Sequence, residues 1–394
     1  MAPLRWLTAG ESHGPSLLVL LDGVPAGLPL LASFIDHDLA RRQRGYGRGG
    51  RMKIERDRVL LEAGVRGGET LGGPLGLRIV NRDHVHWTGR MGPDPFPATP
   101  EAVRTPRPGH ADLVGALKHD RVDLRDVLER ASARETAARV AAGAVARRVL
   151  SLAGVTVASR VVSLGAIDDP TDLAPAAWVL PGAVHEALEA SSLRVCDPAA
   201  EAAMRAEILA ASHAGDTLGG VVEVVALGCP PGLGSYTQWD LRLDARLAMA
   251  AMSVQAIKAV EIGEGWEAAR RRGSAVHDPI GYDPAAGGYT RAANRAGGLE
   301  GGTTTGEPLV LRAAMKPLST LRRALGSVDI LRHTDAPAAV ERSDVCAVPA
   351  AGVVVEAMVA LTLAEALLTK CGGDSMREVL RNLANYRAQV GAHP

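Results

Sequence analysis

The amino-acid sequence predicts an α+β fold, and three observations lead to this prediction. Hydrophobic residues make up 47% of the 394 residues, which is typical of a packed globular protein. Segments with helical spacing and strand-like segments follow one another without the regular alternation of a doubly wound parallel sheet. No repeat and no low-complexity linker divides the chain. We therefore expect a single large domain over residues 1–394, with a loose tail of about ten residues at its end.

The first half of the chain is expected to begin with two strands and to contain two helices. Leu4–Thr8 and Ser16–Leu21 are short apolar runs on either side of a glycine-bounded loop, which is typical of strands. Ser33–Arg44 has helical spacing and stops at a glycine. Ala133–Leu152 is rich in alanine and carries a stripe of valine and leucine, which predicts a helix. The segments rich in Gly, Pro and Arg are expected to form loops, at 45–51 and 89–109.

The second half of the chain mixes strands and helices irregularly. Asp197 followed by Pro198 is a strong helix start, because aspartate caps a first turn and proline fits within it. The C-terminal apolar helix carries Glu356 and Glu365, so we interpret it as a buried core or interface helix and not as a membrane span. The elements expected here are strands at 155–164, 221–227 and 256–262 and helices at 197–211, 240–252 and 352–370.

Charge and composition limit the partners of this chain. Lys plus Arg and Asp plus Glu each number 44, so no overall field attracts nucleic acid or a membrane surface. Aromatic residues are only 3%, which leaves few platforms for stacking bases. The four cysteines are far apart without a C-x-x-C pair, and the N-terminus lacks a signal-peptide pattern. We therefore expect a cytoplasmic protein without metal, nucleic acid or membrane, in which any recognition of anions is local.

The first candidate site is the loop Gly10–Gly14, with the sequence GESHG. Its glycines would let a ligand approach Ser12 and His13 closely on a tight turn. The G-x-S-x-G pattern of a hydrolase nucleophile is not met. Taken alone, a Ser-His pair in a loop is more often structural than catalytic, so this motif needs support from others.

The second candidate is a basic segment with five arginines between residues 41 and 51 and no acidic residue among them. Guanidinium groups bind phosphate and carboxylate in a bidentate manner, and the glycines of this segment would let its backbone approach an anion. Gly45, Gly47 and Gly50 formally match G-x-G-x-x-G. We reject a dinucleotide fold, because a charged helix and not a strand precedes them. Binding of a polyanion is favoured over a merely solvated loop.

Two further segments pair a cation with a titratable or capping group. Prolines stiffen residues 104–112 and bring Arg107 and His110 together, which suits chemistry on a phosphate leaving group. Ser132 and Glu135 have the spacing of a capping box at a helix start. The same helix start, together with Arg134, would also provide an anion site, and the two interpretations are compatible.

The last candidates lie towards the C-terminus. The glycine-rich run 297–306, followed by Lys316–Thr320, is typical of backbone wrapped around a flat or phosphorylated cofactor, with a flexible hairpin as the alternative. It lacks the ending of a P-loop. Arg342 and Asp344 would form an ion pair, or the aspartate would accept a proton in a basic pocket. The pair at 84 and 86 has no third metal ligand nearby, so we interpret these histidines as surface residues.

Together and in this order, these segments resemble the chorismate synthase family from about residue 4 to beyond residue 370. Small departures at 254–255 and 303–304 fall at positions where variation is expected. The resemblance implies a β-α-β sandwich fold, a homotetramer and reduced FMN as the cofactor. It rests on GESHG, RRQRGYGRGGRM, RPGHAD, RASARET, GDTLGG, NRAGGLEGG, KPLST and RSDVCAVPAAGVVVEAMVALTLAEALL.

The resemblance also implies a reaction. The enzyme would be a carbon-oxygen lyase that removes phosphate from 5-enolpyruvylshikimate 3-phosphate by a 1,4-anti elimination, giving chorismate. This is the last step of the shikimate pathway, which leads to the aromatic amino acids. The flavin would not be consumed. Because nothing resembles an appended reductase domain, an external donor would reduce the flavin, with NADPH as an indirect source of electrons.

Residue roles follow from the same resemblance. His13, oriented by Ser12, would act on the departing phosphate, His110 would lie near flavin N1, and Asp344 with Ser132 would manage the proton that leaves C6. The substrate, which carries a phosphate and two carboxylates, needs nearby arginines. The substrate-binding residues would be Arg42, Arg48, Arg51, Arg107 and Arg134. The cofactor-binding residues would be Arg130, Ala131, Ser132, Gln255, Ala256, Gly301, Lys316, Pro317, Leu318, Ser319, Thr320 and Arg342.

Two alternatives stay open at this point. An FMN oxidoreductase would consume NADPH stoichiometrically and would use Arg42 and Arg48 to hold the nucleotide phosphate. A non-enzymatic protein would bind RNA or another polyanion through residues 41–51. The zero net charge and the scarcity of aromatic residues disfavour the second alternative.

Overall fold

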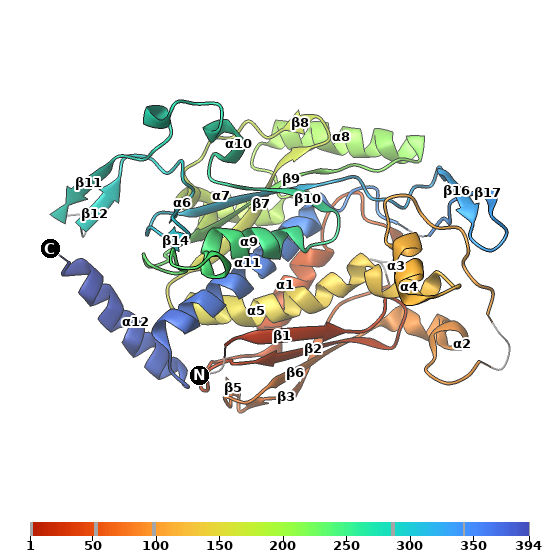
Figure 1. Cartoon of the computed structure of the whole chain (residues 1–394), viewed down its shortest axis with the longest axis horizontal. Helices are drawn as coiled ribbons and strands as arrows, with labels where there is room; N and C mark the ends of the chain where they lie inside the picture. Colours follow the sequence, from red (N-terminus) through yellow and green to blue (C-terminus); the bar gives the residue numbers. More distant parts are fainter. Residues whose placement is uncertain (1–2, 51–53, 97–99, 285–287, 342, 394) are drawn as a thin grey trace.

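Two antiparallel sheets and a group of long helices between them form the body of the molecule (Figure 1). The computed structural model describes residues 3–50, 54–96, 100–284, 288–341 and 343–393. Helices and strands are mixed, and the strands of each of these sheets pair with their neighbours in antiparallel fashion. The α+β prediction is therefore confirmed.

The first sheet presents an apolar face to the helices and a mixed face, with leucines beside charged residues, to the outside. Its order is β1 (Arg5–Ala9), β2 (Ser16–Asp22), β6 (Leu75–Val80) and β3 (Val59–Ala63). Side chains alternate along β2, so that Leu17 is buried and Leu18 and Leu20 are exposed. Leu20 lies opposite Leu7, which is also exposed, so leucines gather on the outer face.

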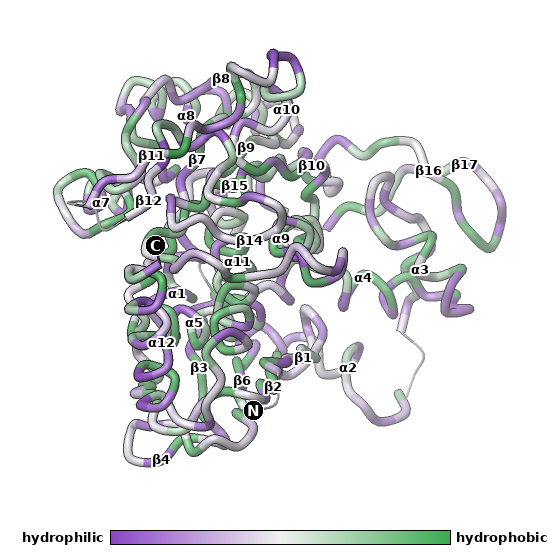
Figure 2. Tube along the Cα trace, turned by 60° about the vertical axis from the view of Figure 1, so that its left-hand side comes forward, coloured by the Kyte–Doolittle hydropathy of each residue, from purple (hydrophilic) through white to green (hydrophobic). Residues whose placement is uncertain are grey.

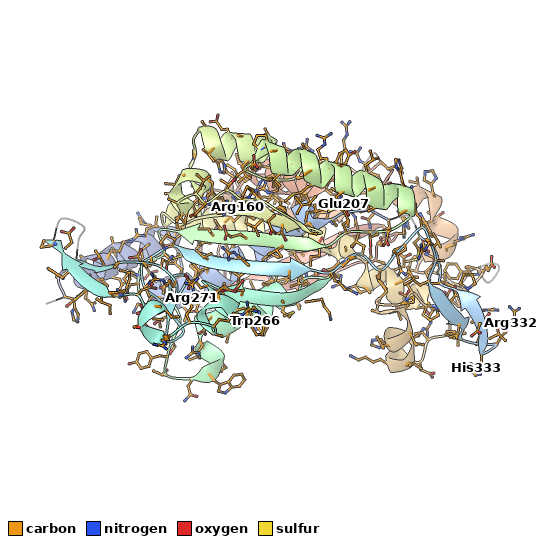
Figure 3. All side chains as sticks on the ribbon, turned by 90° about the horizontal axis from the view of Figure 1, so that it is seen from above. Arg160, Glu207, Trp266, Arg271, Arg332 and His333 are labelled. Carbon is orange, nitrogen blue, oxygen red and sulfur yellow. The ribbon has the colours of Figure 1, made fainter. Side chains whose placement is uncertain are left out.

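The second sheet has the order β10 (Ile257–Ile262), β15 (Leu309–Met315), β9 (Gly220–Leu227), β7 (Thr156–Leu164) and β8 (Ile167–Asp168). At its β8 edge lies α8 (Pro198–Ala214), whose first turn is capped by the Asp197 carboxylate as predicted. Figure 3 views this sheet from above. Arg332 and His333 mark a hairpin at one end of the molecule, and Trp266 and Arg271 lie towards the other.

Three helices fill the space between the sheets: α1 (Ala32–Gln43), α5 (Thr136–Leu152) and α11 (Val348–Cys371). Helices α5 and α11 approach closely at Gly143, where an added Cβ would lie 2.3 Å from Ala357 Cβ. Helix α11 is long and apolar enough to cross a membrane, yet 94% of its most apolar window is buried within the protein. Hydrophobic residues dominate the centre of the molecule around it (Figure 2). The prediction of a buried core helix is confirmed.

Shorter elements complete the chain around this body. Helix α9 (Leu243–Met252) packs on α11, and α4 (Arg125–Ala131) and the 3₁₀ helix η3 (Ala133–Glu135) lead into α5. The remaining elements are β4 (Val65–Arg66), β5 (Glu69–Thr70), η2 (Arg82–His86), α2 (Thr88–Met91), α3 (Asp112–His119), α6 (Pro175–Val179), α7 (Ala183–Ala190), η4 (Trp239–Leu241), α10 (Gly265–Ala268), η5 (Gly273–Ala275), β11 (Ile280–Asp283), β12 (Gly288–Arg291), β13 (Leu299–Glu300), β14 (Thr303–Thr304), β16 (Gly326–Asp329), β17 (Thr334–Pro337) and α12 (Met376–Gly391).

The predicted elements are present, and their boundaries shift for local reasons. The helix expected from residue 240 begins at Leu243, after a separate 3₁₀ turn. The helix expected from residue 352 begins at Val348, because Pro349 occupies its first turn, where proline is tolerated. Helix α12 continues to Gly391, so a helix occupies most of the final ten residues, for which the sequence suggested a loose tail.

Candidate active site

A cavity of about 400 Å³ opens where the loops between these elements converge. It is lined by the loop before β2, the segments after α1 and before α3, the junction of α4 with η3, the turn before β10, the segment after β15 and the loop before α11. Among the described residues that line it, four arginines and one lysine face one glutamate and one aspartate. The wall therefore carries an excess of positive charge, which suits a small polyanion.

Arg42 and Arg134 place cationic nitrogens in this wall. Arg42 donates to Thr136 Oγ1 at 2.8 Å and to the Ala133 carbonyl at 3.0 Å. Arg134 donates from Nη1 to both oxygens of Asp57, at 2.6 and 2.8 Å. Within the described part of the chain, Arg42 Nη1 and Arg134 Nη2 are buried and have no hydrogen-bond partner. They form only long ion pairs, Arg42 Nη1 with Asp57 at 3.5 Å and Arg134 Nη2 with Glu55 at 4.0 Å. Buried guanidinium nitrogens without a close acceptor suit a site for a phosphate or carboxylate.

Burial and the surrounding cations affect the charge of Arg42. Burial, together with the neighbouring charges of Arg134 and Arg48, outweighs Asp57 and Asp344 and lowers the pKa of Arg42 to about 9. The guanidinium is still charged at neutral pH. A bound anion would offset the repulsion between these arginines, so the site favours a ligand with negative charge.

Arg48 and Asp344 join the basic segment to the loop before α11. Arg48 Nε lies 3.2 Å from Asp344 Oδ2, and Oδ1 of the same carboxylate accepts from the Gly49 backbone at 2.6 Å. Ser343 leaves little space at Gly49, where an added Cβ would lie 2.9 Å from the Ser343 carbonyl. Asp344 is therefore held on the cavity wall by two contacts from the basic segment.

His13 is fixed on three sides. The Glu129 carboxylate accepts from its backbone N–H at 2.8 Å and lies 2.9 Å from its Nδ1. Trp87 stacks on the imidazole with ring centroids 4.0 Å apart. Burial raises the pKa of Glu129, but the contacts with His13 and Arg125 outweigh burial and hold it below its usual value. Because this carboxylate can only accept, Nδ1 carries a proton, and Nε2 on the other side of the ring lies 3.9 Å from Asp83 Oδ2.

His110 belongs to a second histidine–carboxylate pair. Its Nδ1 donates to Asp112 Oδ1, and Arg107 donates to the other oxygen of Asp112 from Nε at 2.8 Å. Arg107 also donates to Thr320 Oγ1 at 2.9 Å, which ties this loop to the segment after β15. Burial raises the pKa of Asp112, but His110 and Arg107 outweigh burial and hold it well below the usual range. Arg107 therefore neutralises Asp112 as well as facing the cavity.

The turn before β10 carries a strained residue and an open acceptor. Ala256 has a φ of +68°, a left-handed conformation that costs energy for a residue with a side chain. Its carbonyl accepts from the Lys316 backbone at 2.9 Å. Gln255 Oε1 is buried and finds no hydrogen-bond donor among the described residues. An acceptor of this kind fits the edge of a polar ring such as a flavin.

The structure brings most of the predicted site residues to one cavity. Ser132 Oγ contacts Ser12 Oγ at 3.3 Å, which joins two of the predicted catalytic loops. The predicted residues that line the cavity are Ser12, His13, Arg42, Arg48, Arg107, His110, Ala131, Ser132, Arg134, Gln255, Ala256, Lys316, Leu318, Ser319, Thr320 and Asp344.

A few predicted residues lie elsewhere. Arg130 points to the β1 end and donates to the Thr8 and Gly10 carbonyls. Gly301 lies in the turn between β13 and β14 and does not line this cavity. Pro317 does not line the cavity, although its neighbours do. Arg51, predicted to bind the substrate, and Arg342, predicted to bind the cofactor, lie outside the described residues.

The capping-box prediction holds only in part. Ser132 Oγ accepts from the Arg134 backbone at 3.3 Å, as an N-cap does. Glu135 does not return to the Ser132 backbone: its carboxylate accepts from Thr8 Oγ1 at 2.8 Å, Arg139 Nε at 2.9 Å and Gln255 Nε2 at 3.1 Å. Long-range partners thus replace the local contact.

Several residues of the site have no role in the sequence-based prediction. Glu129 and Trp87 fix His13, and Asp57 fixes Arg134. His84, interpreted as a surface residue, donates from Nδ1 to the His13 carbonyl at 2.8 Å. Of these residues and Asp112, only Asp112 could have been predicted from the sequence as a partner of His110, because it follows His110 by two residues. The others approach their partners from distant parts of the chain.

The fold and the cavity define a protein with a cationic cavity, lined by buried arginines and two histidine–carboxylate pairs, of the kind that suits an enzyme with a small anionic substrate. The family model described as chorismate synthase matches residues 4–368. The chain belongs to the chorismate synthase family, a family of lyases in aromatic amino acid biosynthesis.

Individual relatives agree with this assignment. The chain is 56% identical over 393 residues to the chorismate synthase of Symbiobacterium thermophilum, which covers 98% of this chain and 99% of the relative. It is 56% identical over 391 residues to that of Salinispora tropica, covering 97% and 98%. A crystal structure of chorismate synthase superposes with a TM-score of 0.80 at 43% identity and covers the whole of both chains.

Proposed function

We propose that this protein eliminates phosphate from 5-enolpyruvylshikimate 3-phosphate to give chorismate, with reduced FMN bound in the same cavity. One observation carries the proposal: four arginines and one lysine line the cavity against one glutamate and one aspartate, and two of these arginines, Arg42 and Arg134, keep a buried nitrogen without a hydrogen bond among the described residues. The substrate brings one phosphate and two carboxylates, which supply acceptors for these nitrogens. Charge-assisted hydrogen bonds of this kind are about twice as strong as neutral ones.

The two histidine–carboxylate pairs would divide the proton chemistry. His13 Nε2 would exchange a proton with the departing phosphate while Glu129 holds the imidazole through Nδ1. Asp344, held by Arg48 and Gly49, would accept or relay the proton that leaves C6. Ser12 and Ser132 would orient the substrate between them. These roles use residues of this chain alone.

The residues at the other side of the cavity fit a flavin. Gln255 Oε1, the Lys316 ammonium and the 316–320 segment would hold the ring and its phosphate, and His110 would lie near N1. When bound, a reduced flavin supplies electron density that helps the C–O bond to break. The walls of the cavity would orient this group and exclude water. Flavin reduction would come from an external donor, with NADPH as an indirect source.

Two finer statements are proposed together with the reaction. The exposed leucines on β1 and β2 support association of copies through the outer face of the first sheet, consistent with a homotetramer. The burial of α11 supports a cytoplasmic enzyme. Size-exclusion chromatography with light scattering would test the association, since a monomer would contradict it.

The experiment that tests the function is anaerobic release of phosphate from 5-enolpyruvylshikimate 3-phosphate with FMN either oxidised or chemically reduced. Release only with reduced FMN, at many turnovers per flavin, supports the lyase. Stoichiometric consumption of NADPH would favour an oxidoreductase instead. Absence of release from folded protein in both states would contradict the proposal.

His110 offers a variant for the same assay. His110→Ala removes the imidazole that faces the cavity while Arg107 still neutralises Asp112. Turnover should fall by about 10²–10⁴-fold, the usual range for a lost proton-transfer group. Turnover near that of the wild type with reduced FMN would remove His110 from the mechanism.

A further inference from the structure

One end of the Gln255 side-chain amide has a hydrogen-bond partner, and the other end has none among the described residues. Its Nε2 donates to Glu135 Oε2 at 3.1 Å. Gln255 lines the cavity, and its Oε1 is buried and accepts no hydrogen bond from any described residue. A buried carbonyl without a donor is unfavourable. The cavity therefore needs a ligand that donates a hydrogen bond at this point.

Glu135 decides which end of the amide faces the cavity. Thr8 Oγ1 and Arg139 Nε also donate to its carboxylate, and Glu135 is buried. Burial raises the pKa of Glu135, but Arg139, Gln255 and Thr8 outweigh burial and hold it below its usual value. An ionised carboxylate can only accept, so the amide NH₂ faces Glu135 and the carbonyl points away from it.

The backbone fixes the same side chain from the other direction. Ala256, the next residue, is held in a left-handed conformation, and its carbonyl accepts from the Lys316 backbone at 2.9 Å. Strained residues of this kind persist where the surrounding structure fixes them, often next to a ligand. Gln255 is thus positioned by its side-chain contact and by a rigid turn.

We propose that Glu135 is a positioning residue that turns the Gln255 carbonyl towards the cavity, where it accepts a hydrogen bond from the imide N–H of the flavin ring. The inference rests on the proposed function, because it requires a flavin in the cavity. Oxidised FMN carries one N–H in its ring system, at N3. The contact would select a flavin against a ring system that lacks this donor.

The test compares the dissociation constants of oxidised FMN and of N3-methyl-FMN, measured by fluorescence quenching in the presence of 5-enolpyruvylshikimate 3-phosphate. Wild-type protein should bind FMN roughly tenfold more tightly than the methylated flavin, the range expected for one buried hydrogen bond. In Glu135→Gln, the new amide would donate to Gln255 Oε1 and turn the NH₂ of Gln255 towards the cavity. The ratio of the two constants should then approach one.

Two further variants keep the test decisive. Gln255→Leu removes the acceptor without changing Glu135, and its ratio should also approach one. Glu365→Gln serves as the matched control, since Glu365 pairs with Arg246 on α9 and does not line the cavity; its ratio should equal that of the wild type. Thermal unfolding of each variant checks that it is folded.

The outcomes separate this inference from the proposed function. Absence of binding of either flavin to wild-type protein would contradict the proposed flavin site itself. Tight binding of both flavins with equal affinity would leave the flavin site standing and overturn the role of Gln255. A wild-type ratio in folded Glu135→Gln would overturn the role of Glu135, and a wild-type ratio in Gln255→Leu would overturn the proposal even if the Glu135 variant did not fold.

Discussion

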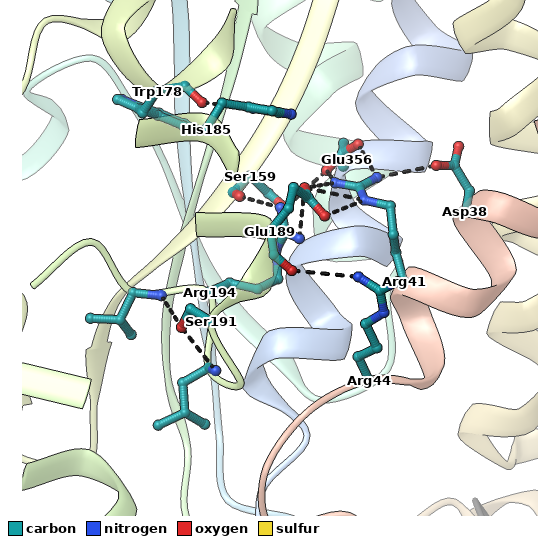
Figure 4. A network of polar contacts seen from close by, with 12 residues as sticks. Asp38, Arg41, Arg44, Ser159, Trp178, His185, Glu189, Ser191, Arg194 and Glu356 are labelled. Atoms are coloured by element: carbon teal, nitrogen blue, oxygen red, sulfur yellow. Dashed lines mark hydrogen bonds and ion pairs between the residues drawn. The ribbon is translucent and has the colours of Figure 1, made fainter. Parts of the chain in front are cut away.

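Arg41 and Arg42 are neighbours on α1 with the same chemistry and similar burial, at 3% and 5% exposed, yet their surroundings are opposite. Arg41 donates to Glu356 at 2.8 and 3.0 Å and to Glu189 at 2.9 Å (Figure 4). Arg42 hydrogen-bonds to neutral oxygens among the described residues, and its buried Nη1 forms only a long ion pair with Asp57 at 3.5 Å. Arg41 is thus held by close carboxylates, whereas Arg42, which lines the cavity, is not.

The charges around Arg41 are matched. Burial raises the pKa of Glu356, but Arg147 and Arg41 outweigh burial and lower it to about 2. Three cations and three anions meet between α1, α5, α7 and α11, namely Arg41, Arg147, Arg194, Asp38, Glu189 and Glu356. Around Arg42 the contacts are looser: Asp57 is shared between Arg134 at 2.6 Å and Arg42 at 3.5 Å, and Asp344 pairs with Arg48 at 3.2 Å. The arginines that line the cavity are therefore less closely matched by carboxylates than those that hold the helices.

The largest loss of stability is expected when the charge network around Arg41 is broken. Glu356→Gln leaves Arg41 and Arg147 without the carboxylate at the centre of α11, so the free energy of unfolding should fall by roughly 3–5 kcal/mol. Urea unfolding would measure this. Glu365→Gln on the same helix, with a partly exposed carboxylate, should change stability by less than about 0.5 kcal/mol. Equal effects of the two substitutions would contradict the structural role of the network.

Substitution of Arg42, which lines the cavity, should reduce activity more than stability. Arg42→Gln removes a buried cation that faces the anion site, so kcat/KM should fall by about 10²–10³-fold in phosphate release. Stability should fall less than in Glu356→Gln, because repulsion from Arg134 and Arg48 offsets part of the attraction of Arg42 to Asp57. A large loss of stability with activity retained would show that Arg42, like Arg41, stabilises the fold and does not bind the substrate.

Acid should weaken the matched network by a similar or smaller amount. The folded-state pKa of Glu356 lies at about 2, below its ordinary value of 4.5. Its contribution is therefore complete above about pH 5 and is lost as the pH falls towards 2, a change of roughly 2–3 kcal/mol. Unfolding free energies of wild type and Glu356→Gln measured between pH 7 and pH 3 should converge as the pH falls. A difference that stays constant over this range would contradict the assigned cause.

The smallest change in stability and activity is expected for substitution of Arg44, the third arginine of the basic segment 41–51. Its exposed side chain donates to the Glu189 carbonyl at 3.4 Å, a long contact in solvent. Arg44→Ala should change the unfolding free energy by less than about 0.5 kcal/mol and leave phosphate release within about twofold of the wild type. A loss of activity comparable to that of Arg42→Gln would mean that the basic segment acts as a whole.

Local signals in the sequence predicted much of this molecule. Asp197 and Pro198 define a helix start through their own chemistry, and glycine-bounded Ser12 and His13 identify a close-approach loop. The ordered motifs gave the family, and most of their residues meet in one cavity. These features depend on residues that are near one another in the chain, which is why the sequence alone determined them.

The choice of partners was decided only by the tertiary structure. A helical step of about 100° separates Arg41 from Arg42, and it directs one towards Glu356, 315 residues away, and the other towards the cavity. For the same reason, Glu135 contacts Thr8 and Gln255, which are distant in the chain, in place of the capping contact with the Ser132 backbone. Spacing along the chain shows that a charge is present, whereas its neutralisation depends on carboxylates that arrive from distant elements when the layers pack.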